Sequence, residues 1–315
     1  MSVMLLLIFG FAMRPTKGQL QYGYYDTTCP DAEEIARTAL HLYFTTDLTS
    51  PASILRVSFH DCQVQGCDAS IMLESGNGIT SELESGSNFG IRRLDIIDGV
   101  KATLEKACPN TVSCADIIAM AGREAVAFTG GPRIDIPLGR RDSTFASAAE
   151  ATASLPAATI SVDQFIALFA GYGMTLSESV AILGAHTLGV GHCKSFANRL
   201  QAGSDPPLGP IFGAQLRTTC IGDGITNLAF VPNDLTNVVF DSQYFKDTNN
   251  GRGLFTIDAE LPLDSRTALI EQTFANDEQA FFDAMISAYV KMTSSRVLTG
   301  DQGQIRQNCR MVNSS

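Results

Sequence analysis

The chain has 315 residues, 45% of them hydrophobic, which is enough to bury one large core or two lobes packed together. Its formal net charge of -11 excludes the basic surface that binding to nucleic acid requires. An acidic surface also repels polyanions, so neutral or cationic small molecules are the expected partners.

The N-terminal segment is typical of a secretory signal peptide. An apolar run from Met4 to Met13 is followed by Arg14 and by small residues at positions 16 and 18, although the usual basic residue before the run is missing. The run is too short to span a bilayer, so no membrane anchor is expected. We predict a leader at residues 1–18 and a secreted protein. Because the chain ends soon after Cys309 without an apolar extension, an extracellular location is favoured over a vacuole.

Apolar residues recur with helical spacing along much of the chain. Ile35, Ala39 and Tyr43 form one stripe within residues 31–45, and Pro51 stands at the start of a helix over residues 51–61. Capping boxes open three further helices, and a long amphipathic helix lies near the end. These four helices are Ser113 to Phe128, Ser161 to Ala170, Thr175 into His186, and Asn276 to Met292.

Strand-like alternation is scarce, which predicts an all-α fold. Polar segments interrupt the helical pattern and are predicted to be loops. These segments are residues 74–90, 141–160 and 201–256.

The eight cysteines are an even number in a chain that carries an export signal, which favours four disulfides. A bond between Cys62 and Cys67 would close a small loop. The alternative, a zinc site, normally uses paired Cys-x-x-Cys spacings, and the sequence has none.

The chain has four histidines, and His60 has the most informative neighbour. Arg56 precedes it by four residues, so the two side chains share one face of a helix. A cation beside an imidazole lowers the imidazole pKa and keeps the ring able to accept a proton, as a general base must. The alternative is a solvent-exposed pair on an amphipathic helix.

An oxygen-rich loop follows His60. Asp61, Asp68 and Ser70 surround Gly66, and the two nearby cysteines would hold the segment tightly. Calcium prefers several carboxylate, hydroxyl and carbonyl oxygens from such a loop. A solvated acidic turn is the alternative.

His186 ends an apolar helix and is flanked by small residues. Gly184, Ala185 and Gly189 would allow a flat group to approach its ring, and a neutral imidazole there could ligate haem iron. A core histidine without a ligand is the alternative.

Six motifs, in their order along the chain, resemble those of the class III secretory plant peroxidases. Together they extend from about residue 20 to residue 313, which is essentially the whole mature chain. The motifs are Arg56-x-x-x-His60-Asp61-Cys62, Gly66-Cys67-Asp68-Ala69-Ser70, Val112-Ser113-Cys114-Ala115-Asp116, Pro137 to Ser143, Gly184-Ala185-His186-Thr187, and Gly303 to Cys309.

The resemblance implies the haem peroxidase fold, in which haem b lies between two lobes. The distal lobe would comprise about residues 19–160 plus the C-terminal helix, and the proximal lobe about residues 161–275. It implies a monomeric enzyme of the cell wall or apoplast that breaks down hydrogen peroxide, takes part in the response to oxidative stress and oxidises small phenolic donors in one-electron steps. The implied disulfides are Cys29–Cys108, Cys62–Cys67, Cys114–Cys309 and Cys193–Cys220.

The resemblance also assigns roles to the histidines. His60 would take a proton from one oxygen of peroxide and deliver it to the other, while Arg56 stabilises the negative charge of the breaking bond. His186 would ligate the iron, and Asp258 would accept the other ring N–H of that imidazole.

Two calcium ions and a substrate-access residue are implied as well. Pro156 matches a proline that the family places near the access site. The first calcium would take Asp61, Val64, Gly66, Asp68, Ser70 and, through water, Glu82; the second would take Thr187, Asp234, Thr236, Val239 and Asp241.

Two segments are one residue shorter than in the family. Counting forward from Glu82 reaches Asn88 as the residue that orients His60, whereas counting backward from Arg92 reaches Ser87. The segment from residue 234 to 241 is shortened too, which leaves Thr236 and Val239 open as ligands.

The remaining polar residues are interpreted as structural. His41 and His192 have no ligand-like partner at useful spacing, and Asp116 with Arg140 matches a buried ion pair of the family. One alternative function is a catalytically impaired, extracellular haem- and calcium-binding protein with the same fold. A zinc hydrolase built on His60 and Asp61 is a third reading, but it lacks a second nearby histidine.

Overall fold

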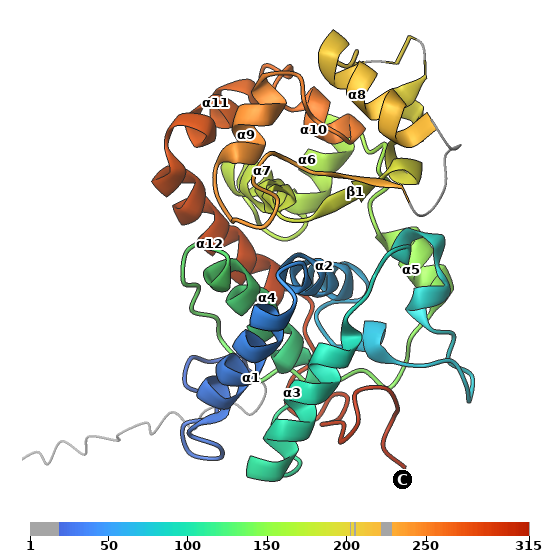
Figure 1. Cartoon of the computed structure of the whole chain (residues 1–315). Coiled ribbons are helices and arrows are strands. Elements are labelled where there is room, and N and C mark those ends of the chain that lie inside the picture. Colours follow the sequence, from blue (N-terminus) through green and yellow to red (C-terminus); the bar gives the residue numbers. More distant parts are fainter. Residues whose placement is uncertain (1–18, 202, 205, 222–228, 315) are drawn as a thin grey trace, which may run out of the picture.

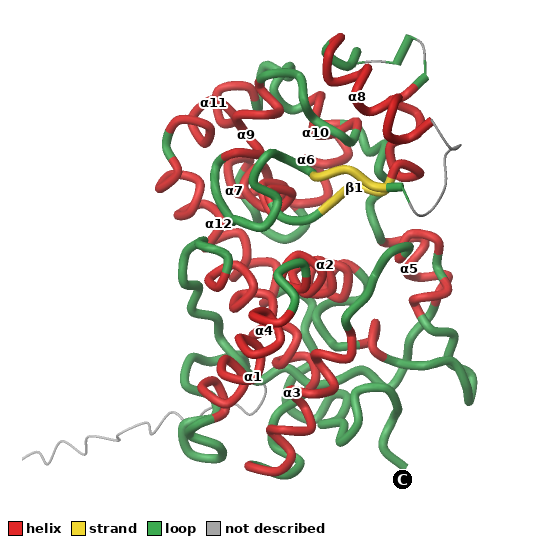
Figure 2. The backbone as a smooth tube through the Cα atoms, in the orientation of Figure 1, coloured by secondary structure: helices red, strands yellow, loops and turns green. Residues whose placement is uncertain are grey.

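The computed structural model describes residues 19–201, 203, 204, 206–221 and 229–314. The leader predicted at residues 1–18 lies outside the described residues. In the described ranges the chain is mainly helical with one small sheet, which confirms the all-α prediction (Figure 2). No helix within these ranges is long and apolar enough to cross a membrane.

The N-terminal elements occupy the lower half of Figure 1. Their centre is α4, which packs against α1, α2 and α3. The elements are α1 (Ala32–Thr46), α2 (Ser50–Gln63), the short 3-10 helices η1 (Ser70–Met72), η2 (Glu82–Glu84) and η3 (Gly86–Asn88), α3 (Leu94–Ala107), α4 (Cys114–Phe128) and α5 (Ala148–Ser154).

The following elements occupy the upper half of Figure 1, above α2, and α12 runs down from them toward α4. They are α6 (Val162–Ala170), α7 (Leu176–Leu183), η4 (Gly184–Thr187), β1 (Val190–His192), η5 (Cys193–Leu200), α8 (Pro210–Ile221), β2 (Phe230–Pro232), α9 (Gln243–Asn249), α10 (Thr256–Glu260), α11 (Ala268–Asn276) and α12 (Glu278–Ser294). The strands β1 and β2 pair antiparallel.

The helix α4 is buried along almost its whole length because nearly every residue in it is apolar or small. The side chain of Ser113 caps it by accepting a hydrogen bond from the amide of Asp116. Gly122 allows α2 and α12 to approach α4 closely, because a Cβ atom at this position would collide with the Tyr289 hydroxyl of α12 and with Ser58 of α2. The core therefore depends on a glycine at the crossing of α2, α4 and α12.

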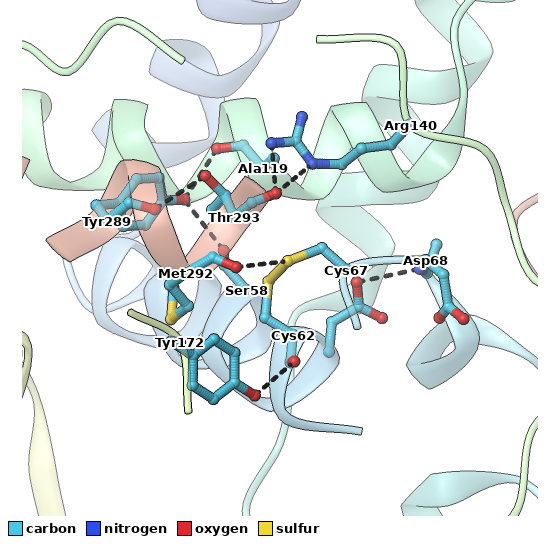
Figure 3. The surroundings of a disulfide bond; sticks show 12 residues. Ser58, Cys62, Cys67, Asp68, Ala119, Arg140, Tyr172, Tyr289, Met292 and Thr293 are labelled. Atoms are coloured by element: carbon cyan, nitrogen blue, oxygen red, sulfur yellow. Dashed lines mark hydrogen bonds between the residues drawn. A yellow bond between two sulfur atoms is a disulfide. The ribbon is translucent and has the colours of Figure 1, made fainter. Parts of the chain in front are cut away.

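A chain of hydrogen bonds joins these three helices (Figure 3). Ser58 Oγ lies 3.0 Å from the Tyr289 hydroxyl, which donates to the carbonyl of Ala119 at 2.9 Å. Cys62 lies one turn further along α2, and its carbonyl accepts a hydrogen bond from the Tyr172 hydroxyl. This bond holds the disulfide between Cys62 and Cys67 against the same core. The helix that carries Arg56 and His60 is thus fixed from two sides.

Four disulfides join the same pairs of cysteines that the resemblance implied. The bond between Cys114 and Cys309 ties the C-terminal segment to the start of α4. The backbone amide of Arg306 donates to Asp142, whose other carboxylate oxygen accepts from the amide of Ala115. The motif from Gly303 to Cys309 near the end of the chain therefore closes the core.

Some of the predicted loops are wrong. Residues 141–160 contain α5, and residues 201–256 contain α8, β2 and α9, whereas 74–90 contains only short 3-10 turns. The prediction also missed α3, although its buried residues have helical spacing. Because α5 is a seven-residue helix, packing against η2 and η3 rather than its own periodicity stabilises it.

Candidate active site

The helix α2 presents Arg56 and His60 one turn apart. Pro51 in its first turn fits a position where no amide hydrogen bond is needed, and the apolar face of α2 packs most extensively on α4. Arg56 Nε donates to His60 Nε2 over 3.1 Å. His60 is buried and Arg56 is half-buried, which argues against the solvent-exposed alternative.

Burial sets the charge state of both groups. His60 is only 8% exposed, and burial together with the neighbouring Arg56 charge lowers its pKa to about 3. Burial also lowers the pKa of Arg56 to about 10, which leaves the guanidinium charged at neutral pH. The site thus holds a neutral imidazole beside a permanent cation.

Asn88 fixes the tautomer of His60. The amide Nδ2 of Asn88 donates to the carbonyl of Glu82 over 2.7 Å, which turns its Oδ1 toward His60 Nδ1, also at 2.7 Å. The proton of the neutral ring therefore sits on Nδ1, and Nε2 is the acceptor. Of the two open candidates the structure brings Asn88, and not Ser87, to the histidine.

A second histidine is held by a carboxylate in the upper half of the molecule. His186 lies in η4, directly after α7, and its Nδ1 is 3.0 Å from Asp258 Oδ1. Asp258 also accepts hydrogen bonds from the Tyr244 hydroxyl, at 3.0 Å, and from the Phe255 amide. Burial and the adjacent carboxylate raise the pKa of Tyr244 well above its usual value, so its hydroxyl remains a donor.

The sequence analysis missed Tyr244. It lies 14 residues before Asp258 in the chain, on a helix that was expected to be loop, and no local motif distinguishes it. Its contact with Asp258 exists because α9 packs against η4, the element that carries His186.

The donor set around His186 fits a haem iron. With Nδ1 engaged by Asp258, Nε2 is the ring nitrogen left for a metal, and His186 keeps 34% of its side chain exposed while Asp258 is buried. The rings of Phe255 and Tyr244 lie 5.2 and 5.9 Å from the imidazole, which gives apolar surroundings suited to a flat ring. Gly189, three residues further on, approaches Ala52 of α2, so this segment lies against the helix that carries Arg56 and His60.

The acidic loop after His60 is buried, contrary to the alternative of a solvated turn. Asp61 accepts hydrogen bonds from the amides of Ala69 and Ile71, and Asp68 accepts one from the amide of Ser70. Burial raises the pKa of Asp61 well above its usual value, and that of Asp68 to about 6. At Gly66, with φ of +122°, any side chain would collide with the backbone of Arg296.

Several oxygens of this loop lack partners. Ser70 Oγ and both carboxylate oxygens of Glu82 are buried without a hydrogen bond, and burial raises the pKa of Glu82 to about 8. Within the described ranges no three His, Cys, Asp or Glu side chains are arranged to hold a metal by themselves. A cation here would therefore need hydroxyl and backbone carbonyl oxygens as well, and calcium is the ion that accepts such a mixture.

The structure also gathers the residues predicted for a second calcium, despite the shortened segment. The Thr187 hydroxyl lies 2.6 Å from Asp234 and 3.2 Å from Asp241, and it is 3.4 Å from the carbonyl of Val239. Thr236 donates its amide to Asp234 and its hydroxyl to Asp241. Burial raises the pKa of Asp234 to about 6. All five candidate ligands are thus neighbours, Thr236 and Val239 included.

Pro156 lies just beyond the end of α5 and is half-buried. That helix supports the site from outside: Ser85 and Thr152 are joined by a 2.7 Å hydrogen bond, and Val64 packs with Ala151. The helix α5, which the sequence analysis did not predict, therefore holds the loop that carries Glu82 and Asn88.

The two other histidines differ in their surroundings. His41 Nε2 lies 3.4 Å from a carboxylate oxygen of Glu124 at the contact of α1 with α4, a structural position. His192 does not fit the expectation of a residue without useful partners. A Cβ atom on Gly90 would lie 3.3 Å from His192 Nε2 and equally close to Arg56 Nη1, so His192 borders the site.

Asp116 and Arg140 form the expected buried ion pair. Arg140 Nη1 lies 2.8 Å from Asp116 Oδ1, and both side chains are fully buried. Arg140 also donates to the carbonyl of Thr293, which couples the pair to α12 (Figure 3). The pair joins α4 to α12 and stabilises the helix junction.

A surface pocket of about 630 Å³ lies elsewhere, along one side of α8. Its lining consists of apolar, amide and hydroxyl side chains without a titratable group, so it offers no catalytic chemistry. The residues that line it are Pro210, Ile211, Ala214, Gln215, Thr218 and Thr219.

Comparison with known proteins agrees with this geometry. The family model described as "Peroxidase" matches residues 36–277. Peroxidase 29 of Arabidopsis thaliana is 47% identical over 320 residues, which cover 99% of this chain and 94% of that protein. Peroxidase 57 of the same plant and Peroxidase 5 of Vitis vinifera are each 40% identical and cover 98% and 100% of this chain, and 97% and 98% of their own lengths.

Proposed function

The chain belongs to the plant class III peroxidase family, and from this premise we propose that His60 and Arg56 act on hydrogen peroxide while small phenolic molecules supply the electrons. Membership makes the protein a peroxidase, an oxidoreductase that reduces hydrogen peroxide. The single observation that carries the assignment of residues is the network in which Asn88 holds the proton on Nδ1 of His60, so that Nε2, which accepts from Arg56 in this structure, is the nitrogen able to take a proton.

The proposed steps use three side chains. His60 Nε2 takes a proton from one oxygen of peroxide and returns it to the other oxygen, which leaves as water. The Arg56 guanidinium stabilises the negative charge that develops on the departing oxygen, and its partial removal from water strengthens this interaction. Asn88 keeps the imidazole oriented. Two donor molecules each lose one electron and one proton, so that one peroxide becomes two waters.

We propose that haem b is held by His186 through Nε2. Family members typically bind haem, and the pairing of His186 with Asp258 is the arrangement that makes an imidazole a stronger ligand. When bound, haem supplies the redox-active iron that links peroxide reduction to one-electron oxidation of the donors. Asp258, supported by the Tyr244 hydroxyl, would keep the His186 ring in place.

Two calcium ions are proposed to neutralise the buried acids. The first would lie among the oxygens of Asp61, Val64, Gly66, Asp68 and Ser70, with Glu82 reached through water, and the second among Thr187, Asp234, Thr236, Val239 and Asp241. The unpartnered oxygens of Ser70 and Glu82 support the first site. The hydrogen-bonded cluster around Thr187 supports the second.

The four disulfides and the family relationship are consistent with the secretory pathway. We propose that the mature enzyme is a monomer in the cell wall or apoplast, cleaved before Gln19, with a distal and a proximal lobe on either side of the haem and with Pro156 near the entrance for donors. The use of phenolic molecules as donors and the monomeric state are both part of this proposal.

Visible absorption of the purified, haem-loaded protein tests the proposed function. We expect a strong Soret band that shifts when hydrogen peroxide is added and returns when a phenol is added, because the residues around His60 are arranged for proton transfer to and from peroxide. A band that peroxide leaves unchanged would instead indicate a haem-binding protein without turnover. Absence of any haem band would contradict the proposal.

Removal of calcium is expected to lower stability. If the ion binds only the folded state, a free calcium concentration of 100 times its Kd adds about 2.7 kcal/mol to the free energy of unfolding, and a chelator removes that amount. Thermal melting with and without chelator measures the effect. Glu82→Gln should reduce the calcium-dependent shift, whereas Glu84→Gln, an exposed residue two positions away, should leave it intact. Equal melting curves with calcium and with chelator would exclude both sites.

A further inference from the structure

A buried glutamate lies behind the histidine that is proposed to hold haem. Glu271 is fully buried on α11, although Leu269 and Gln272 of the same helix are exposed. The helix α11 packs most extensively against α9, which carries Tyr244 (Figure 1). A carboxyl group withdrawn from water in this way is costly unless it is paired or uncharged. Glu271 takes no part in the proposed steps on peroxide.

The contacts of the Glu271 carboxyl group fit a neutral acid. Its Oε2 lies 2.9 Å from the hydroxyl oxygen of Thr248, and its Oε1 has no hydrogen-bond partner among the described residues. The Thr248 hydroxyl also lies 3.1 Å from the carbonyl oxygen of Phe245, which can only accept a hydrogen bond. A hydroxyl has one proton to donate, so both contacts are satisfied together only when the carboxyl group carries a proton and donates it to Thr248.

The helix α9 connects Glu271 to the carboxylate that holds His186. Thr248 lies one turn after Tyr244, so the two side chains share one face of α9. The Tyr244 hydroxyl donates to Asp258 over 3.0 Å, and Asp258 Oδ1 lies 3.0 Å from Nδ1 of His186. The carboxyl groups are close enough to interact: burial and, to a smaller extent, the charge of Asp258 raise the pKa of Glu271 to about 8, while the hydrogen bond with Thr248 lowers it.

The other charged groups around α11 are engaged elsewhere or exposed. The helices packed against α11 are α9, α12 and α7. Asp247 of α9 lies 3.5 Å from Arg252, and Glu178 of α7 lies 2.7 Å from Lys291 of α12. The remaining charged side chains of these three helices are exposed, namely Lys246, Glu278 and Asp283. Asp258 is therefore the charged group that acts most directly on Glu271.

We propose that Glu271 is a positioning residue, a neutral carboxylic acid whose proton limits the negative charge behind His186. With this proton in place, the charge that attracts the Nδ1 proton of His186 is that of Asp258. Loss of the proton adds a second negative charge, so His186 becomes a stronger ligand, and a stronger ligand favours the oxidised iron. The inference rests on the proposed function and adds a residue, on the far side of Asp258, that sets how strongly His186 binds.

Infrared spectroscopy of the protein loaded with haem and calcium tests whether Glu271 holds a proton. The wild type should show the band of a protonated carboxyl group at about pH 6, shifted in D2O and lost by about pH 10, since these values lie about two units on either side of the pKa of Glu271. Glu271→Gln should lack this band. Asp283→Asn, which also removes one carboxyl group but from an exposed position on α12, is the matched control and should keep it.

The reduction potential of the iron in the haem-loaded enzyme tests whether this proton acts on His186. The potentials of the wild type and of Glu271→Gln should agree at about pH 6, where both side chains are neutral, and the wild-type value should fall below that of the variant as the pH rises through about 8. Thr248→Val removes the hydroxyl that lowers the pKa of Glu271, so the fall should move to higher pH. Resonance Raman spectra of the reduced wild type should show a stronger bond from iron to His186 above this pH, and those of Glu271→Gln should not.

The two proposals fail in different ways. If the Soret band of the wild type does not respond to peroxide, the proposed function is wrong. If it responds normally but the wild type and Glu271→Gln share either the same infrared spectrum or the same pH dependence of the potential, only this inference is overturned. Thr248→Val decides the matter if Glu271→Gln does not fold, since a fall in potential at the wild-type pH would contradict the role of Glu271.

Discussion

Replacing His60 by alanine is expected to slow the reaction with hydrogen peroxide by about 10²- to 10⁴-fold while haem stays bound. The side chain is the neutral base of the site, held by Asn88 and Arg56, and a positioned general base contributes a factor of this size. Stopped-flow absorption after mixing with peroxide measures the rate. The Soret band before mixing shows whether haem is retained, as expected if His186 is the ligand.

A matched control uses another histidine of the same lobe. His41→Ala removes an imidazole from α1, where it contacts Glu124 and Phe128, and should leave the rate with peroxide unchanged. If His60→Ala reacts at the wild-type rate, the residue is not the base and the proposed mechanism is wrong.

The pH dependence of the rate with hydrogen peroxide follows from the lowered pKa of His60. Because the pKa of His60 is lowered to about 3, the ring is neutral above that pH, so the wild-type rate should be constant near neutrality and fall as the pH drops through about 3. Arg56→Leu removes one cause of the lowering, so the fall should occur at a higher pH. An unchanged midpoint in this variant would show that the Arg56 charge does not act on His60.

Arg140→Met is expected to reduce the free energy of unfolding by about 3–5 kcal/mol, because it leaves the carboxylate of Asp116 buried without its cation. The remaining donors to Asp116, the Tyr25 hydroxyl and the backbone amides of residues 139 and 140, are neutral and cannot replace that charge. The variant also loses the hydrogen bonds to Thr293 that tie α12 to the core. Denaturant unfolding of the haem-loaded protein measures the loss.

Arg133→Met, at an exposed position seven residues earlier, is the control and should have little effect on stability. The double variant Asp116→Leu with Arg140→Met should be less destabilised than the two single losses together, because no unpaired charge then remains. If Arg140→Met unfolds like wild type, the buried pair does not contribute to stability in the way proposed.

Much of the site follows from local sequence. Arg56 and His60 face the same way because residues four apart lie on one side of a helix, and the helix itself is signalled by Pro51 and by its apolar residues. Ser113, Ser161 and Thr175 cap helices as their spacing predicted, with the full reciprocal box at the last two. Short-range geometry alone determines each of these features.

Other features needed segments that are distant along the chain. Sequence counting favoured Asn88 but left Ser87 open, and the hydrogen bond from Asn88 Nδ2 to the carbonyl of Glu82 is what turns Asn88 toward His60. The periodicity of α5 is too short to detect, since seven residues make fewer than two turns. Because α5 was not predicted, the sequence did not reveal which element packs against the loop of Glu82 and Asn88.

The sequence by itself indicated the helical class through helical spacing, and its motifs in fixed order indicated the family; the disulfide pairing and the roles of the two histidines then came from that resemblance. The tertiary structure decided which polar groups meet: Tyr244 with Asp258, and Asn88 with His60. Such contacts depend on how whole helices and strands pack, and packing brings together side chains that no local pattern relates.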